Sequence, residues 1–235
     1  MPEVTAKKKI STAKAKGKQD TSLLKLPLGE QAYLAIKKMI LDMDLRPGDY
    51  ISVGQLSDRL SLGRSPVHTA LHRLSREGMV QILPRKGILV KSETANSFVE
   101  LLAARLLIEP YLTGLAAERV DDALVSELEK LIVAGRRFEK AKDRLGGMRI
   151  DRMFHQCLYK ASGNEMLSDF AELLLDRSMR LWFVSIVELS SHHSNIADLE
   201  DLCVSIKAGD REASSRKMEA HIGAIRKKFA VLGVS

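Results

Sequence analysis

Apolar residues recur at helical spacing over most of the chain, and one short stretch has the composition of strands. Residues 29–43 place five apolar side chains on one helical face: Ala32, Ile36, Met39, Ile40 and Met43. Residues 52–60 and 65–77 predict two shorter helices, with Ser52 and Ser65 as capping residues. Residues 79–83 and 87–90 predict two strands joined by a hairpin. This order of three helices and a two-stranded wing is typical of a winged helix-turn-helix.

From residue 94 onward, helical spacing dominates and strand signals are lacking. The pattern predicts six helices, over residues 94–119, 122–140, 148–162, 164–188, 195–207 and 210–231. Four pairs of residues are interpreted as breakers between them: Asp121-Asp122, Gly146-Gly147, Gly163-Asn164 and Gly209-Asp210. Six helices in this length favour an antiparallel bundle. The expected fold is therefore mainly α.

The chain has a formal net charge of +7, and all of its excess positive charge lies in the first 92 residues. Residues 1–20 carry six Lys and two acidic residues, and residues 21–92 carry eleven Lys/Arg and six acidic residues. Residues 93–235 carry 20 basic and 22 acidic residues. A basic module joined to a nearly neutral one fits a part that binds a polyanion. We expect a disordered basic arm at 1–22, a winged helix at 23–92, and an all-helical domain at 93–235.

Targeting signals are lacking in this sequence. It contains no apolar run of 18 residues, so no membrane span is expected. Its basic N-terminal residues are not followed by the apolar core of a signal peptide, so no secretion signal is expected. Cys157 and Cys203 belong to no closely spaced motif and are expected to be buried thiols in a reducing compartment. The expected location is the cytoplasm.

The helix at 65–77 has the two faces of a DNA-reading helix. Val67, Ala70, Leu71 and Leu74 form its apolar face. The predicted DNA contacts are Arg64, Ser65, His68 and Thr69, with Arg85, Lys86 and Gly87 of the wing. Arg64 suits guanine, His68 a base or phosphate, and Ser65 a phosphate at the helix N-terminus. Each basic residue alone is more often surface charge, but the consistent order of apolar faces, caps and hairpin favours DNA binding.

Residues 29–92 resemble the winged helix of the GntR family of bacterial repressors. The resemblance rests on Leu45-Arg46-Pro47-Gly48-Asp49, on Leu56 to Leu71, on Leu74 to Val80 and on Arg85-Lys86-Gly87. Arg64 and Pro66-Val67 match the family pattern Ser-Arg-Thr-Pro-Val-Arg-Glu-Ala-Leu. Gly63, His68 and Thr69 depart from it, where the family has Ser, Arg and Glu. The resemblance therefore implies an operator that differs from the common family sites or is bound less tightly.

Residues 97–231 resemble the FCD effector domain of the FadR-like branch of that family. The matching stretches include Arg105 to Pro110, Asp151 to His155, and Met218 to His221. The count of six helices is similar to the VanR-type subgroup. The resemblance implies that residues 93–235 form an effector-binding and dimerisation domain, in a homodimer whose effector is a small carboxylate.

A metal site is predicted in this second part. Asp151 and His155 are four residues apart, so they share a helix face and could bind one cation. The resemblance adds His221 as a ligand of a divalent ion such as Zn, Ni or Mn. A further family His corresponds to Leu199, so that ligand is missing, unless His192 or His193 replaces it.

Three interpretations of these residues stay open. Asp151, His155 and His221 could hold a metal ion, or His155 and His221 could contact an anionic effector directly. Alternatively, the three residues only pair with one another in a polar core. Arg105 could face the same cavity and pair with a carboxylate.

The favoured function is a ligand-responsive repressor, not an enzyme, that binds a palindromic double-stranded operator as a two-fold dimer. One alternative is an architectural nucleic-acid-binding protein with a structural bundle. The other is a metal-dependent hydrolase using Asp151, His155 and His221, but the sequence offers no general base or nucleophile motif beside them.

Overall fold

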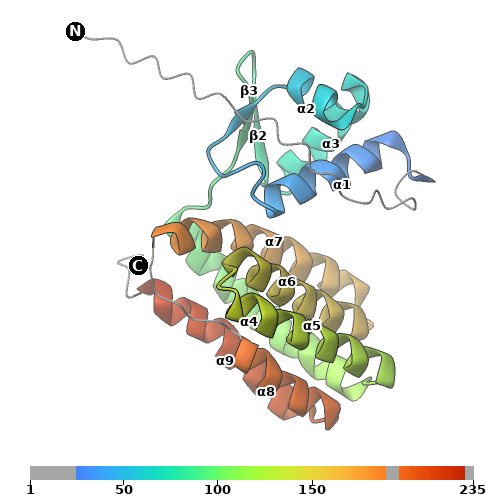
Figure 1. Ribbon diagram of the computed structural model, residues 1–235, viewed down its shortest axis with the longest axis vertical. Helices are drawn as coiled ribbons and strands as arrows, with labels where there is room; N and C mark the ends of the chain where they lie inside the picture. Colours follow the sequence, from blue (N-terminus) through green and yellow to red (C-terminus); the bar gives the residue numbers. More distant parts are fainter. Residues whose placement is uncertain (1–24, 189–195, 231–235) are drawn as a thin grey trace.

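The computed structural model describes residues 25–188 and 196–230, which form two lobes (Figure 1). The smaller lobe contains α1 (Leu28–Leu41), β1 (Tyr50–Ile51), α2 (Val53–Leu60), α3 (Arg64–Arg76), β2 (Val80–Leu83) and β3 (Gly87–Val90). Its core is a cluster of apolar side chains from all three helices and from β2 and β3. This order confirms the predicted winged helix-turn-helix. The basic arm predicted at 1–22 lies outside the described residues.

The wing has three strands, so the prediction of a two-stranded wing was incomplete. The strand order is β1-β3-β2, and both pairings are antiparallel. Tyr50 pairs with Leu89, and Ile51 with Ile88. A two-residue strand is too short to show alternation, and its partner lies far along the chain.

The starts of the two helices in the helix-turn-helix differ from each other. The Ser52 hydroxyl accepts from Gln55 N and forms a capping box, as expected of a capping residue. The cap of α3 is Gly63 and not Ser65, so this prediction was wrong. Gly63 has extended backbone (φ −62°, ψ 159°), and Ser65 and Pro66 already lie within the first turn.

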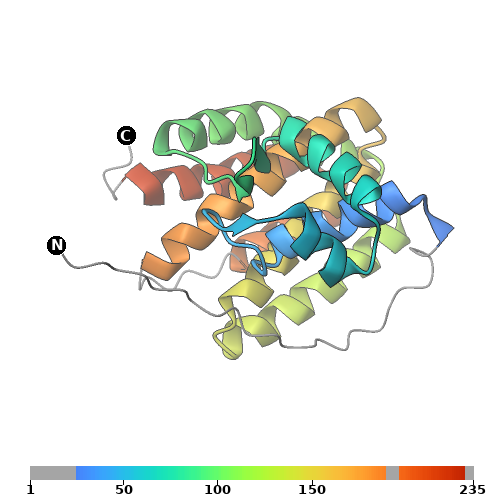
Figure 2. The same cartoon turned by 90° about the horizontal axis from the view of Figure 1, so that it is seen from above.

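The larger lobe is the predicted six-helix bundle. Its helices are α4 (Ala95–Glu118), α5 (Asp122–Lys140), α6 (Arg144–Ala161), α7 (Glu165–Glu188), α8 (Ile196–Lys207) and α9 (Arg211–Ala230). Figure 2 shows the bundle from above, behind the winged helix. Helix α4 is central and packs against α6, α7, α8 and α9. Among the described residues, no helix is both long and apolar enough to cross a membrane.

Three of the predicted breaks are confirmed, and the fourth was wrong. Asp121, Asn164 and Asp210 each accept a backbone N–H at the start of the following helix. By contrast, Gly146 and Gly147 lie inside α6, which begins at Arg144 after the cap Asp143. A Cβ on Gly146 would come within 2.6 Å of the Phe138 ring. This glycine therefore permits close packing of α5 on α6 and does not end a helix.

Candidate functional site

The predicted reading helix α3 has one buried and one exposed face. Val67, Ala70, Leu71 and Leu74 are buried in the core of the small lobe. The exposed side chains are Arg64, Ser65, His68, Thr69, His72, Arg73 and Arg76. The apolar face predicted from the sequence is thus the packed face, and the polar face is open to solvent.

Individual side chains on the exposed face have local contacts. The imidazole rings of His68 and His72 meet edge to face, with centroids 4.5 Å apart. The Thr69 hydroxyl donates to the carbonyl of Ser65 at 3.2 Å. His68 therefore sits beside a second aromatic ring, whereas Thr69 bonds within its own helix.

The wing tip exposes two cations beyond the sheet. Arg85 and Lys86 are exposed, and Arg85 adopts a left-handed backbone conformation (φ 62°). Gly87 begins β3 with φ 99°, and a Cβ there would lie 3.0 Å from the carbonyl oxygen of Ile51. Figure 1 shows the hairpin of β2 and β3 pointing away from the bundle. The structure thus requires glycine at position 87 for the turn, with the two cations presented outward.

Replacing Gly63 by serine is expected to raise the free energy of unfolding by a few tenths of a kcal/mol. The extended backbone accepts any residue, and the new Cβ would lie 3.6 Å from Pro66 Cδ, an ordinary contact. A serine hydroxyl could accept the free N–H of Ser65, since Pro66 has none. Thermal unfolding measures the change, and Gly63→Ala is the control because it fills the space without an acceptor. Equal melting temperatures for the two variants would contradict the capping argument.

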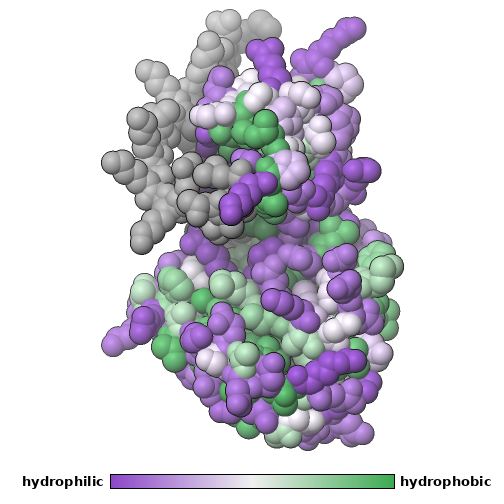
Figure 3. All heavy atoms as spheres, turned by 90° about the vertical axis from the view of Figure 1, so that its right-hand side faces the viewer, coloured by the Kyte–Doolittle hydropathy of each residue, from purple (hydrophilic) through white to green (hydrophobic). Residues whose placement is uncertain are grey.

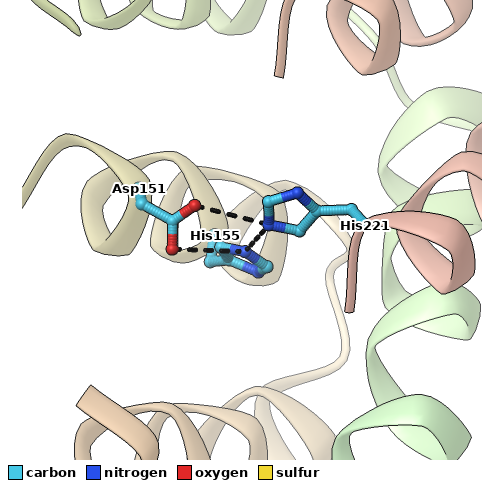
Figure 4. Close-up of side chains that lie close together, drawn as sticks. All are labelled: Asp151, His155 and His221. Atoms are coloured by element: carbon cyan, nitrogen blue, oxygen red, sulfur yellow. Dashed lines mark hydrogen bonds and ion pairs between the residues drawn. The ribbon is translucent and has the colours of Figure 1, made fainter. Parts of the chain in front are cut away.

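The second site lies in the bundle, where α6 and α9 meet (Figure 4). Asp151, His155 and His221 each offer a ligand atom, and these atoms lie within 4.8 Å of one another. Nε2 of His155 is 3.3 Å from Nε2 of His221, which is 3.3 Å from Oδ1 of Asp151. His155 is fully buried and His221 nearly so. The structure therefore brings together the three residues that the sequence singled out.

Two carboxylates that were not predicted from the sequence lie next to the Nδ1 atoms of the two histidines, on the side away from the site. Oε2 of Glu109, on α4, lies 2.6 Å from Nδ1 of His155. Oδ2 of Asp198, on α8, lies 3.6 Å from Nδ1 of His221. A carboxylate at Nδ1 favours a proton there and leaves Nε2 as the ligand atom. Both Nε2 atoms in fact face the site.

Arg105 contacts Glu109, so the carboxylate it meets belongs to the chain itself. Both side chains are buried, and Arg105 Nε and Nη2 donate to the two oxygens of Glu109. Burial raises the pKa of Glu109, but Arg105 and His155 outweigh it and bring the pKa to about 2. Glu109 is therefore an anion between two site residues.

Asp151 and His221 form a second pair of opposite charges in the site. Burial raises the pKa of Asp151, but His221 and His155 outweigh it and hold the pKa well below its usual range. Burial lowers the pKa of His221, whereas Asp151 and Asp198 raise it, to about 9. Without a metal ion, His221 is therefore a cation at neutral pH and pairs with the Asp151 carboxylate.

The position of the missing family ligand is apolar. Leu199 is fully buried in the main core of the bundle, with Leu202 and Ile222. Its neighbour Asp198 is the α8 residue that approaches His221. His192 and His193, which could have replaced the ligand, lie outside the described residues.

The separations of the donor atoms suit a small divalent ion. Two nitrogens that bind one zinc ion at about 2.0–2.1 Å with tetrahedral angles are about 3.3 Å apart. The Nε2 atoms of His155 and His221 are separated by this distance. Oδ1 of Asp151 is buried without a hydrogen bond of normal geometry. The three residues fit Zn²⁺ or Ni²⁺, which imidazole prefers, and the carboxylate also suits Mn²⁺.

Known protein families match both lobes. The family described as bacterial regulatory proteins, gntR family, matches residues 28–90, and the FCD domain matches residues 100–224. An HTH-type transcriptional regulator of Streptomyces ambofaciens is 29% identical over 201 residues, covering 82% of this chain and 81% of that protein. The HTH-type transcriptional regulator YdhC of Bacillus subtilis is 25% identical over 195 residues, covering 81% and 86%.

Solved structures share the fold. Escherichia coli McbR/YncC superposes with a TM-score of 0.79 at 20% identity, covering 88% of this chain and 99% of that one. Family, relatives and fold together define a DNA-binding transcription regulator. The chain belongs to the GntR family of bacterial regulatory proteins and carries an FCD domain.

Proposed function

We propose that this chain is a repressor that binds a palindromic operator as a homodimer and is released by a small organic acid. The observation that carries the proposal is the exposed polar face of α3, which is accompanied by the outward cations of the wing. Two relatives bear the name of transcriptional repressors: RspR of Escherichia coli, 24% identical over 196 residues, and NanR of Klebsiella aerogenes, 25% identical over 246 residues.

Specific roles follow for the residues of the DNA interface. Arg64 bonds a guanine in the major groove, Ser65 binds a phosphate, and His68 reaches a base or a phosphate. Thr69 lines the same face, and Arg85 and Lys86 contact the minor groove or backbone, on a turn that Gly87 makes possible. The arm at 1–22 adds contacts with phosphates that do not depend on sequence.

The helical domain at 93–235, which contains the FCD match at 100–224, is proposed to bind the effector and to form the dimer, as in the VanR-type subgroup. Asp151, His155 and His221 would hold one divalent ion. Such an ion supplies positive charge and open coordination positions that suit a carboxylate. Arg105 adds a buried cation beside the site. The two winged helices of the dimer are proposed to adopt two arrangements, one that binds the operator and one that does not. The effector changes DNA affinity only as far as it binds one arrangement more tightly than the other.

The test begins with selection of operators from a random duplex library by the full chain. A repressor of this type is expected to enrich a palindrome and to bind it with a dissociation constant of about 10⁻⁸–10⁻¹¹ M. Small organic acids are then screened, with and without Zn²⁺, for release of the selected duplex. Enrichment of no common sequence, or binding that no acid weakens, would count against the proposal.

Arg64→Ala is expected to weaken binding to the selected operator by about 1–3 kcal/mol and to relax the preference at one base pair of each half-site. Arg64 is the first residue of α3, and its side chain is exposed. The N-terminal end of a recognition helix is the part that contacts base edges in the major groove. Fluorescence anisotropy on the operator and on its single-base variants measures both effects. Arg59→Ala is the control, because this exposed arginine lies on α2 and faces Asp44. A uniform loss for all sequences would assign Arg64 to a phosphate.

A further inference from the structure

The two lobes meet where α1 lies next to α7 (Figure 1), and ion pairs between charged side chains cross this contact. Lys37 Nζ on α1 lies 2.8 Å from Oδ2 of Asp176 on α7. Arg149 Nε on α6 lies 3.0 Å from Oδ1 of Asp42, the residue after α1. Each hydrophobic cluster of the described residues stays within one lobe, and the lobes meet at a narrow waist (Figure 3). Ion pairs thus cross this contact, whereas no hydrophobic cluster of the described residues does.

Asp176 is the centre of the junction. Its side chain is fully buried, with Oδ2 facing Lys37 and Oδ1 2.7 Å from Nε of Arg152. Burial lowers the pKa of Lys37, but Asp176 more than offsets this and keeps the pKa above its usual value. One buried carboxylate thus lies between a cation of each lobe. Removal of Lys37 or Arg152 leaves the negative charge of Asp176 poorly compensated.

From Lys37 the contacts continue to the reading helix. Lys37 donates to the Tyr33 hydroxyl at 3.1 Å, and Tyr33 donates to Glu77 at 3.0 Å. Glu77 caps the end of α3 and accepts from Arg73 of that helix at 3.1 Å. The Arg73 guanidinium also lies 3.6 Å above the Tyr33 ring. The position of Lys37 is therefore tied to α3.

The other end of the network reaches the candidate metal site. Arg152 directly follows Asp151 on α6, and Gln156 directly follows His155. Arg152 donates to Gln156 at 3.0 Å as well as to Asp176. Helix α6 thus carries two site residues and, next to each, a residue of the hydrogen-bond network around Asp176.

We infer that Asp176 is a positioning residue, which holds the reading helix against the bundle by pairing with Lys37, and which connects that helix to the Asp151, His155 and His221 site through Arg152. The docking role stands on the contacts alone. The connection to the metal site rests on the proposed function.

Solution scattering of the full chain tests the docking role. Asp176→Asn and Lys37→Met are expected to raise the radius of gyration while circular dichroism keeps its helical signal. Lys37→Met preserves the test should Asp176→Asn not fold. Lys130→Met is the matched control, since this exposed lysine lies on α5 and pairs with Glu127 of the same helix. Wild-type scattering from folded Asp176→Asn and Lys37→Met would overturn the inference.

Operator binding with Zn²⁺ as the only added ligand tests the connection. In the wild type, Zn²⁺ is expected to change operator affinity by about 5–150-fold, the range of typical allosteric coupling. In Lys37→Met, zinc and DNA still bind, but the change falls to within about twofold. Coupling of wild-type size in Lys37→Met would overturn the connection. Failure of the wild type to bind zinc would instead refute the proposed metal site, and failure to select a duplex would refute the proposed operator binding. In both cases scattering would still decide the docking role.

Discussion

Replacing Glu109 by alanine is expected to lower the free energy of unfolding by about 3–5 kcal/mol. Glu109 is fully buried and Arg105 is 3% exposed, so the substitution leaves a buried guanidinium without its carboxylate. It also removes the anion 2.6 Å from Nδ1 of His155. Urea denaturation followed by circular dichroism at neutral pH measures the loss.

Two comparisons make this result specific. Glu118→Ala, on the same helix, removes an exposed pair with Arg211 and is expected to leave stability nearly unchanged. The double variant Arg105→Met with Glu109→Leu removes both buried charges and is expected to recover most of the loss. If Glu109→Ala lowered the free energy of unfolding no more than Glu118→Ala does, the Arg105–Glu109 pair would not contribute as a buried ion pair.

Local signals were sufficient to predict most of the fold. The apolar face of α3 follows directly from residue spacing, and Ser52 and Asp210 cap helices as short polar residues do. Gly163 and Gly209, both at φ 67°, end helices in the left-handed conformation that glycine favours. Each of these features depends on neighbours within a few residues, which the sequence displays.

Features that depend on distant contacts could not be predicted in this way. The pairing of Tyr50 with Leu89 joins residues far apart in the sequence. Gly146 resembles a breaker in sequence, yet its role is to make room for Phe138. Glycine has the same local signature in both situations, and only packing distinguishes them.

The candidate metal site shows the same division. The spacing of Asp151 and His155 placed both on one helix face, whereas His221 required a family resemblance. Glu109 was missed because α4 is buried on several sides, so no polar face marks its inward residues. Its spacing of four from Arg105 was the available signal, since such pairs meet on a helix.

His221→Ala is expected to abolish stoichiometric zinc binding. The wild type should carry about one zinc per chain, because Asp151 and two histidines converge at distances that suit one ion. Loss of a partner behind a ligand typically costs about 10–100-fold in affinity, and loss of the ligand itself should cost more. Elemental analysis of protein purified without chelators or a histidine tag measures the metal content.

His68→Ala is the matched control, since His68 lies exposed on α3, in the other lobe. It should keep the zinc that His221→Ala loses. Zinc retained by His221→Ala would place the ion elsewhere. If the wild type took up no divalent ion even when supplied with one, the cationic His221 would remain paired with Asp151, which helps to raise the pKa of His221 to about 9. The anionic effector would then contact His155 and His221 directly, and it should bind without metal.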